Sequence, residues 1–437
     1  MSVEKMDVKA NYCDFFEGTE KLLEIWFGRR QESNSLNCDL RSIPRTTWEK
    51  ILQIVKCTII SFKKNDYIDA YVLSESSMFV SKSRIILKTC GSTTLLKAVK
   101  PLIYVVRDLT DFDVVLDIFY SRKNFMRPEL QDKPHTSFED ETEALDQLFD
   151  GSAYCLGRIN RDCWYLYTLN PLEDFIGVQV PDQTLEVIME KLDPKVMKIF
   201  TKEVCSTAKE ATQKSGIDKL MPGLAIDDYL FDPCGYSMNG LFKGGYYVTI
   251  HITPEPGYSY VSFETNYPQE SYSDLINRYK FVLPGKFKCF IANKLSVASL
   301  SNCLTHKVDF KGFCRKELQF SHFKNYDLTY ALFAKAPRRA LVWRTPAQAY
   351  VRDCLLPGIR HGARSIMLRA AISWFSAGPI VALKERTSGE KNRQILADQM
   401  HLMVRISFPA GDRIFQVDNA PVFAACQLTN TGLKLSI

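Results

Sequence analysis

The segment Tyr246-Tyr-Val-Thr-Ile-His-Ile-Thr253 decides the architecture, because its apolar and polar side chains alternate from residue to residue. Val248, Ile250 and Ile252 face one way and the polar side chains face the other, which is the period of a strand with two different faces. Further short β-rich runs lie at 57–62, 70–80, 84–89, 163–169 and 259–265. Strands joined by polar turns, with helices between them, predict an α+β protein built on antiparallel sheets.

Apolar residues at helical spacing predict the helices. The expected segments are 18–30, 93–109, 142–149, 183–192 and 272–281. In the first, Leu22, Leu23, Trp26 and Phe27 recur behind Thr19. No sequence repeat of fixed short period is present.

The composition is that of a globular protein, with 437 residues, 46% hydrophobic and 24% charged. No apolar run approaches the roughly 18 residues that cross a bilayer, and residues 1–14 lack the apolar core of a signal peptide. The 13 cysteines are scattered, with no C-x-x-C pair and no zinc-ligand spacing. We therefore expect a cytosolic (cytoplasmic) protein with reduced cysteines, no metal and no membrane contact.

The net charge of +6 comes from the end of the chain. From residue 337 onward there are 14 Lys+Arg against 6 Asp+Glu, which leaves 42 against 44 for the rest. A basic tail gives no reason to expect nucleic-acid binding by the main body. We expect one domain at 1–335 and, at 336–437, an appendage of unknown order.

The usual catalytic signatures are missing: no Walker loop, no G-x-G-x-x-G, no H-E-x-x-H and no G-x-S-x-G occur. Two neighbouring stretches stand out instead, Tyr71-Val-Leu-Ser-Glu-Ser-Ser-Met-Phe-Val-Ser81 and Leu87-Lys-Thr-Cys-Gly91. Taken alone, they describe a hydroxyl-rich strand and a turn. Phe231-Asp-Pro-Cys-Gly-Tyr-Ser-Met-Asn-Gly240 and His251-Ile-Thr-Pro-Glu-Pro256 complete the pattern.

Together these segments resemble the S-adenosylmethionine decarboxylases of animal type. Further matching stretches lie at 15–24, 120–125, 162–167, 181–186 and 262–266, so the resemblance runs from about Phe15 to Lys335. It implies a four-layer αββα sandwich with two large antiparallel sheets. It also implies a homodimer of processed protomers.

The resemblance implies a self-cleaving zymogen of polyamine (spermidine and spermine) biosynthesis. Ser76 attacks the carbonyl of Glu75 to form an ester, elimination follows, and Ser76 becomes a covalent pyruvoyl cofactor. His251 matches the base of the elimination, and Ser237 matches the hydroxyl that supports the ester. The pyruvoyl carbonyl then forms a Schiff base with S-adenosylmethionine, and Cys90 matches the proton donor after decarboxylation; a thiol pKa of about 8.5 suits a donor.

The resemblance also assigns ligand contacts. Phe16 and Phe231 match the rings that hold the adenine, Glu255 matches the ribose acceptor, and Leu73 matches a substrate contact. Six residues match a putrescine site: Glu24, Asp182, Thr184, Glu186, Glu264 and Phe119. Buried carboxylates need a counter-ion, and a diamine dication is one. The alternative is an internal salt-bridge network that includes Lys21, Lys88 or Arg122.

Two other functions compete with the enzyme. One is an inactive paralogue that acts as a regulatory subunit, and the other is a polyamine- or nucleoside-binding module that never processes. The presence of Ser76, Cys90, Ser237 and His251 favours the enzyme over the paralogue. Cleavage into two chains would separate the enzyme from the binding module.

Overall fold

The computed structural model describes residues 15–30, 37–170, 182–269, 272, 275–276, 286–294, 312–323 and 326–335, with four short strands beyond them. The chain divides into two compact units, 1–338 and 339–437. In the second unit, β17 (Met367–Ile372) pairs antiparallel with β18 (Ala377–Leu383), and β19 (Ile414–Gln416) pairs parallel with β20 (Lys434–Ser436).

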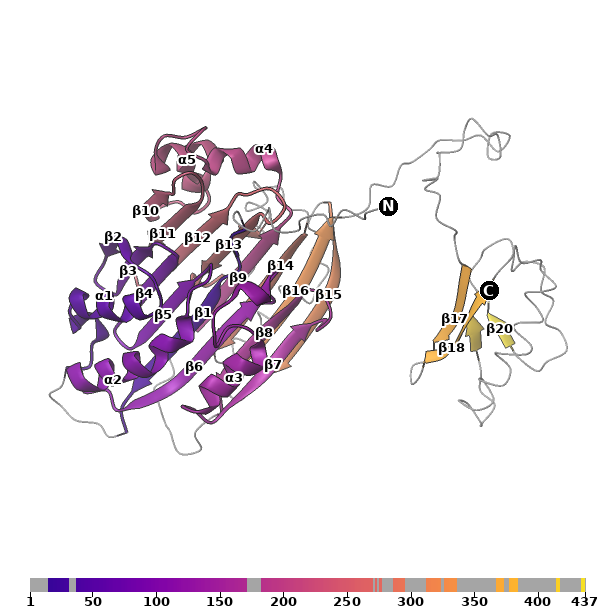
Figure 1. The fold of residues 1–437 in the computed structure, drawn as a ribbon, viewed down its shortest axis with the longest axis horizontal. Coiled ribbons are helices and arrows are strands. Elements are labelled where there is room, and N and C mark those ends of the chain that lie inside the picture. Colours follow the sequence, from indigo (N-terminus) through magenta and orange to yellow (C-terminus); the bar gives the residue numbers. More distant parts are fainter. Residues whose placement is uncertain are drawn as a thin grey trace, which may run out of the picture. The chain divides into compact units, whose positions relative to one another are not determined.

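Two eight-stranded antiparallel sheets form the first unit (Figure 1). In spatial order, the first sheet contains β2 (Ile59–Lys64), β3 (Ile68–Leu73), β4 (Ser76–Ser81), β5 (Arg84–Thr89), β1 (Lys21–Gly28), β6 (Val114–Lys123), β8 (Cys163–Leu169) and β7 (Gly151–Gly157). The second contains β10 (Ala225–Leu230), β11 (Tyr236–Leu241), β12 (Tyr247–Thr253), β13 (Tyr260–Thr265), β9 (Asp182–Glu190), β14 (Lys286–Lys294), β16 (Tyr326–Lys335) and β15 (Phe313–His322).

The two sheets repeat one topology, because adding eight to each strand number of the first gives the order of the second. In each sheet the strand that comes first in the chain lies in the interior. β1 is hydrogen-bonded between β5 and β6, and β9 is hydrogen-bonded between β13 and β14.

Helices cover the outer faces of the sheets. α1 (Arg45–Ile54), α2 (Val99–Leu109) and α3 (Phe138–Asp146) pack on the first sheet, and α4 (Pro194–Met197) and α5 (Ala208–Ser215) accompany the second (Figure 1). Short 3-10 turns lie at Leu40–Ser42, Leu95–Ala98, Pro128–Leu130, Lys198–Phe200 and Ile217–Lys219. Each large apolar core lies between one sheet and its own helices. The predicted four-layer αββα sandwich is therefore confirmed.

Local sequence explains where the helices begin and end. The Ser137 hydroxyl accepts a hydrogen bond from the Asp140 amide and starts α3, and Thr207 does the same for α5. α5 ends at Gly216, whose φ of +79° is a left-handed conformation that glycine adopts without strain. Within the described residues, no helix combines the length and apolar character needed to span a bilayer.

Several predicted elements are confirmed. The runs 84–89 and 163–169 are β5 and β8, and 93–109 contains a 3-10 turn followed by α2. The run 70–80 is two strands, β3 and β4, joined by a tight turn. Of the predicted helix 272–281, only Tyr272, Leu275 and Ile276 lie within the described residues.

Two predicted helices are wrong, because 18–30 contains β1 and 183–192 contains β9. In β1, Leu23, Ile25 and Phe27 pack toward the helices, whereas Glu24 faces the other sheet. The space between the sheets holds buried charged groups. Both faces of these strands are therefore buried, and the face between the sheets carries charged as well as apolar side chains. The apolar residues of the two faces together then recur at a spacing that resembles that of a helix.

Candidate active site

The Glu75–Ser76 bond lies at the tight turn that joins β3 to β4. Leu73 and Ser76 are paired across the hairpin, which leaves Ser74 and Glu75 as its two-residue loop. Ser76 has a φ of +124°, a conformation that side-chain-bearing residues rarely adopt. Such backbone strain typically costs about 1–3 kcal/mol and persists only where the surroundings impose it. The bond expected to break is thus held in a strained turn.

Polar groups surround the two atoms that would react. The Glu75 carbonyl oxygen accepts a hydrogen bond from the Cys90 amide at 3.0 Å, and the Cys90 thiol lies 3.5 Å from the same oxygen. The Ser76 hydroxyl donates to Glu20 Oε1 at 2.5 Å. Burial raises the pKa of Glu20, but Lys88 and the Ser76 hydrogen bond outweigh it, so this pKa lies below its usual range. Glu20 is therefore a carboxylate.

His251 is a buried, neutral imidazole between two hydroxyl groups. Its Nδ1 lies 2.9 Å from Ser237 Oγ, and its Nε2 lies 2.7 Å from Thr249 Oγ1. Burial, opposed by the nearby Glu20, lowers the pKa of His251 from 6.5 to about 4. At neutral pH the ring has an unprotonated nitrogen, as a general base requires.

Cys90 is held as a thiol. Burial is the main cause that raises its pKa well above the ordinary value, and the carboxylates of Glu75 and Glu20 add to it, whereas Lys21 opposes it. A protonated sulfur can donate a proton but is a poor nucleophile.

A cavity of about 210 Å³ opens onto these groups. Its lining includes eight of the nine residues predicted for catalysis and substrate binding: Phe16, Glu75, Ser76, Cys90, Phe231, Ser237, His251 and Glu255. One carboxylate oxygen of Glu255, Oε2, is buried without a hydrogen-bond partner. Such an oxygen fits a ligand that brings hydroxyl donors.

Leu73 lies apart from this group. It is fully buried in the apolar core between the first sheet and its helices. Its side chain does not line the cavity. A substrate contact by Leu73 would therefore have to come from its main chain.

The predicted acidic residues gather between the sheets. Glu24, Phe119, Asp182, Thr184 and Glu186 line one small cavity of about 50 Å³. Glu264 completes the set through a buried lysine: Lys88 Nζ lies 2.7 Å from Glu264, 3.2 Å from Glu186 and 3.4 Å from Glu20. All six residues predicted for the diamine therefore lie within one inter-sheet region.

Two cations enter this region. Besides Lys88, Arg84 lies 2.6 Å from Asp182 and 3.5 Å from Glu24. Burial, with repulsion from Glu264 and from Glu20, raises the pKa of Glu186 from 4.5 to about 8, although Lys88 opposes the shift. The crowded carboxylates thus favour the protonated form of Glu186.

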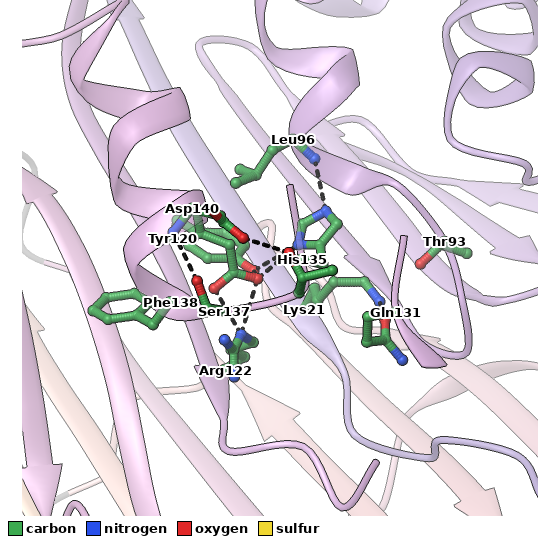
Figure 2. Close-up of polar contacts among 12 residues, drawn as sticks. Lys21, Thr93, Leu96, Tyr120, Arg122, Gln131, His135, Ser137, Phe138 and Asp140 are labelled. Atoms are coloured by element: carbon green, nitrogen blue, oxygen red, sulfur yellow. Dashed lines mark hydrogen bonds and ion pairs between the residues drawn. The ribbon is translucent and has the colours of Figure 1, made fainter. Parts of the chain in front are cut away.

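Lys21 and Arg122 bind groups outside the acidic set. Lys21 Nζ donates to the Gly91 carbonyl at 2.9 Å and to Gln131 Oε1 at 3.1 Å, on the strand face that points to the helices (Figure 2). Because Gly91 follows Cys90, Lys21 fixes the loop that carries the thiol. The internal partners of the acidic set are thus Lys88 and Arg84, and Arg84 was not predicted.

Arg122 belongs to a buried cluster on the same face. Its Nε donates to both carboxylate oxygens of Glu141, at 2.9 and 2.8 Å. Glu141 also accepts from the Tyr120 hydroxyl at 2.5 Å and lies 2.7 Å from His135 Nδ1. This cluster ties β6 to α3.

Sequence reasoning missed Glu20, although it lies in the quoted 15–24 stretch. The signal was the strand period: Glu20 directly precedes β1, and residues 20, 22 and 24 would share a face if the extended chain began there, so a strand prediction would have placed Glu20 on the side of Glu24. Within the described residues, no group of three or more His, Cys, Asp or Glu side chains could hold a metal ion.

The sequence is similar to a known enzyme family over most of its length. The family model of adenosylmethionine decarboxylase matches residues 13–334. A Xenopus laevis S-adenosylmethionine decarboxylase proenzyme is 49% identical over 333 residues, 76% of this chain and 98% of the relative. The Drosophila melanogaster proenzyme is 48% identical (75% and 98%), and the Caenorhabditis elegans proenzyme is 41% identical (74% and 88%).

Proposed function

The chain belongs to the adenosylmethionine decarboxylase family, and we propose that it makes its cofactor from Ser76 and decarboxylates S-adenosylmethionine for polyamine synthesis. Its relatives are proenzymes of the same name, so its activity is a pyruvoyl-dependent decarboxylation. The observation that carries the assignment to Ser76 is the strained turn at Glu75–Ser76, which lies beside a neutral His251.

Self-cleavage uses groups already in place. Ser76 Oγ gives its proton to Glu20 and attacks the Glu75 carbonyl carbon, while the amide and thiol of Cys90 donate to the developing oxyanion. The C–N bond breaks, the amine takes up a proton, and an ester links Glu75 to Ser76 Oγ. His251 removes the Ser76 α-proton, the Cβ–Oγ bond breaks, and Glu75 leaves as a carboxylate. The dehydroalanine left at residue 76 tautomerises to an imine, and water hydrolyses the imine to the pyruvoyl group with release of ammonia.

The residues of the cavity fit the group that results. A pyruvoyl carbonyl supplies an electron sink for the loss of CO₂ from an amino acid. The protonated Cys90 is positioned to deliver a proton to the cavity, and the unpartnered Glu255 oxygen accepts from ribose hydroxyls. Phe16 and Phe231 offer ring faces to the adenine and to the sulfonium cation.

Putrescine is the proposed activator, bound between the sheets. Five carboxylates and two cations meet there, and burial together with the excess of negative charge raises the pKa of Glu186. A diamine dication would add the missing charge, with Thr184 and Phe119 beside it in the same cavity. Glu20 joins the two sites, because it contacts both Lys88 and Ser76.

We further propose a cytosolic homodimer. The eight cysteines whose side chains the structure describes are free, which suits a reducing compartment. The edge strands β7 and β15 expose large apolar side chains: Tyr154, Ile159 in the adjoining loop, and Phe320 are 37%, 72% and 48% exposed. A second protomer could cover this edge.

Intact mass measurement tests the cleavage. Breaking the 50.0 kDa, 437-residue chain after residue 75 should give fragments of roughly 8.6 and 41 kDa, because 437 − 75 leaves 362 residues. The larger fragment should resist Edman degradation, and Ser76→Ala should stay whole and inactive. An uncleaved chain with decarboxylase activity would refute the proposal, and an uncleaved chain that only binds polyamine would support the binding module.

A further inference from the structure

A row of buried polar side chains runs from β11 through β4 to β12, behind the proposed base. The Ser77 hydroxyl donates to Asn239 Oδ1 at 2.7 Å, the Thr249 hydroxyl donates to Ser77 Oγ at 3.5 Å, and Thr249 Oγ1 lies 2.7 Å from His251 Nε2. Ser77 and Thr249 are fully buried, and Asn239 is 1% exposed. The row therefore has no access to bulk water.

The donors in this row point in one direction. An amide oxygen only accepts, so Asn239 takes the single proton of the Ser77 hydroxyl, and Ser77 Oγ is left to accept from Thr249. With its own proton directed to Ser77, Thr249 Oγ1 can only accept from His251 Nε2.

A second observation favours a proton on the same ring nitrogen. The carboxylate of Glu20 lies on the Nε2 side of the imidazole, with Oε1 3.7 Å from that atom. A negative charge there stabilises an Nε2–H group. Nδ1 is then the unprotonated nitrogen, facing Ser237 Oγ at 2.9 Å on the side that lines the cavity.

We propose that Ser77 and Thr249 are positioning residues that fix the tautomer of His251 and so keep its Nδ1, the nitrogen that faces Ser237 of the cavity lining, unprotonated and basic. The inference rests on the proposed self-cleavage. In the elimination, the Ser76 Cα–H bond breaks and its proton goes to Nδ1. The released electron pair forms the Cα=Cβ bond, Oγ leaves with Glu75 as a carboxylate, and His251 becomes an imidazolium that carries both N–H groups.

The proposal predicts a specific kinetic defect. Thr249→Val removes the acceptor of Nε2–H, so the ring should favour the wrong tautomer while ester formation, which does not use His251, continues. Ester should accumulate and elimination should slow by about 10- to 100-fold, the range for loss of an orienting hydrogen bond to a histidine ligand. Thr249→Ser keeps the hydroxyl and should restore the rate. Ser77→Ala, a smaller change, frees the Thr249 proton to donate to Nε2 and should give the same defect.

Hydroxylamine separates the two steps in the full-length chain. It cleaves the ester and releases a large fragment whose Ser76 amine can be sequenced, whereas the product of elimination is blocked. Thr265→Val is the matched control, because this buried hydroxyl donates to the Tyr247 carbonyl at 2.7 Å, outside the row.

Each outcome is decisive. Ester accumulation in Thr249→Val and Ser77→Ala, with rescue by Thr249→Ser, supports the proposal. The proposal is overturned if Thr249→Val and Ser77→Ala both eliminate as fast as Thr265→Val. It is also overturned if Thr249→Ser does not restore the elimination rate. A wild-type chain that never breaks at Glu75–Ser76 would instead refute the proposed function, so the two failures are distinct.

Discussion

Replacing Glu186 with glutamine should stabilise the folded protein at alkaline pH and have no such effect near pH 4.5. Burial, with the neighbouring Glu264 and Glu20, raises the pKa of Glu186 from 4.5 to about 8. The unfolded chain releases this proton near 4.5, whereas the folded chain holds it to about 8. Between these values the folded state binds more protons, so the stability contributed by Glu186 is lost as the pH rises.

The magnitude follows from the size of the shift. One pKa unit corresponds to 1.36 kcal/mol, so a change from 4.5 to about 8 sets an upper limit of about 5 kcal/mol above pH 8. Glutamine resembles the protonated side chain and does not titrate. It also weakens the 3.2 Å contact with Lys88, which is an offset that depends little on pH. Domains of 150–250 residues gain roughly 2–4 °C in Tm per kcal/mol, so the difference in Tm should grow by several degrees from pH 5 to pH 8.5.

Thermal unfolding across that pH range measures the effect, with Ser76→Ala in both proteins so that each is a single uncleaved chain. Glu49→Gln is the control for a lost surface carboxylate, since Glu49 pairs with Arg45 on the exposed side of α1. Saturating putrescine should depress the pKa of Glu186 and shrink the pH trend of the parent. Parallel Tm curves for Glu186→Gln and its parent would show that Glu186 is ionised throughout, and the charge argument for the diamine would fail.

Four further predictions concern the site and the chain end. Burial lowers the pKa of His251 to about 4; the Glu20 carboxylate opposes this shift and the Lys88 ammonium adds to it. The imidazole is therefore neutral and basic above about pH 4. The elimination rate, measured from about pH 5.5 to 8, should not change with pH. Glu255→Ala should raise the KM for S-adenosylmethionine about tenfold or more with a smaller change in kcat, in steady-state assays, since one hydrogen bond to a charged group contributes about 1.5–3 kcal/mol. Asp182→Asn should blunt the response in a putrescine titration while basal turnover persists, and a response equal to wild type would remove Asp182 from the activator site. Deleting residues 336–437 should preserve cleavage and turnover, because every proposed site residue lies before them; loss of cleavage would move the domain boundary.

The architecture and the site were predictable to different depths. Residues 246–253 alternate between an apolar face toward the helices and a polar face toward the other sheet, so β12 was clear from its pattern. The four-layer fold and the roles at Ser76 and His251 came from the family resemblance, because no local rule marks a serine for self-cleavage.

The errors share one physical cause. β1 and β9 were predicted as helices because the face they turn between the sheets carries charged groups, such as Glu24 and Glu186, that are buried all the same. A prediction from hydrophobic periodicity assumes that charged side chains face the solvent. The same assumption concealed Arg84, whose guanidinium completes the inter-sheet charge pattern only in three dimensions.

The place of β1 determines what becomes of the molecule once the Glu75–Ser76 bond is broken. The short fragment would retain β1, β2 and β3, and β1 is hydrogen-bonded on both sides to strands of the long fragment, β5 and β6. The short fragment cannot dissociate unless the hydrogen bonds of β1 to both neighbouring strands break, which would open the first sheet. Folding of the uncleaved precursor is unimolecular, whereas renaturation of the mature protein requires two separate chains to meet. After thermal unfolding, the cleaved protein should therefore refold at a rate that depends on protein concentration, whereas the uncleaved precursor should not. Cleavage thus changes refolding from a one-chain to a two-chain reaction.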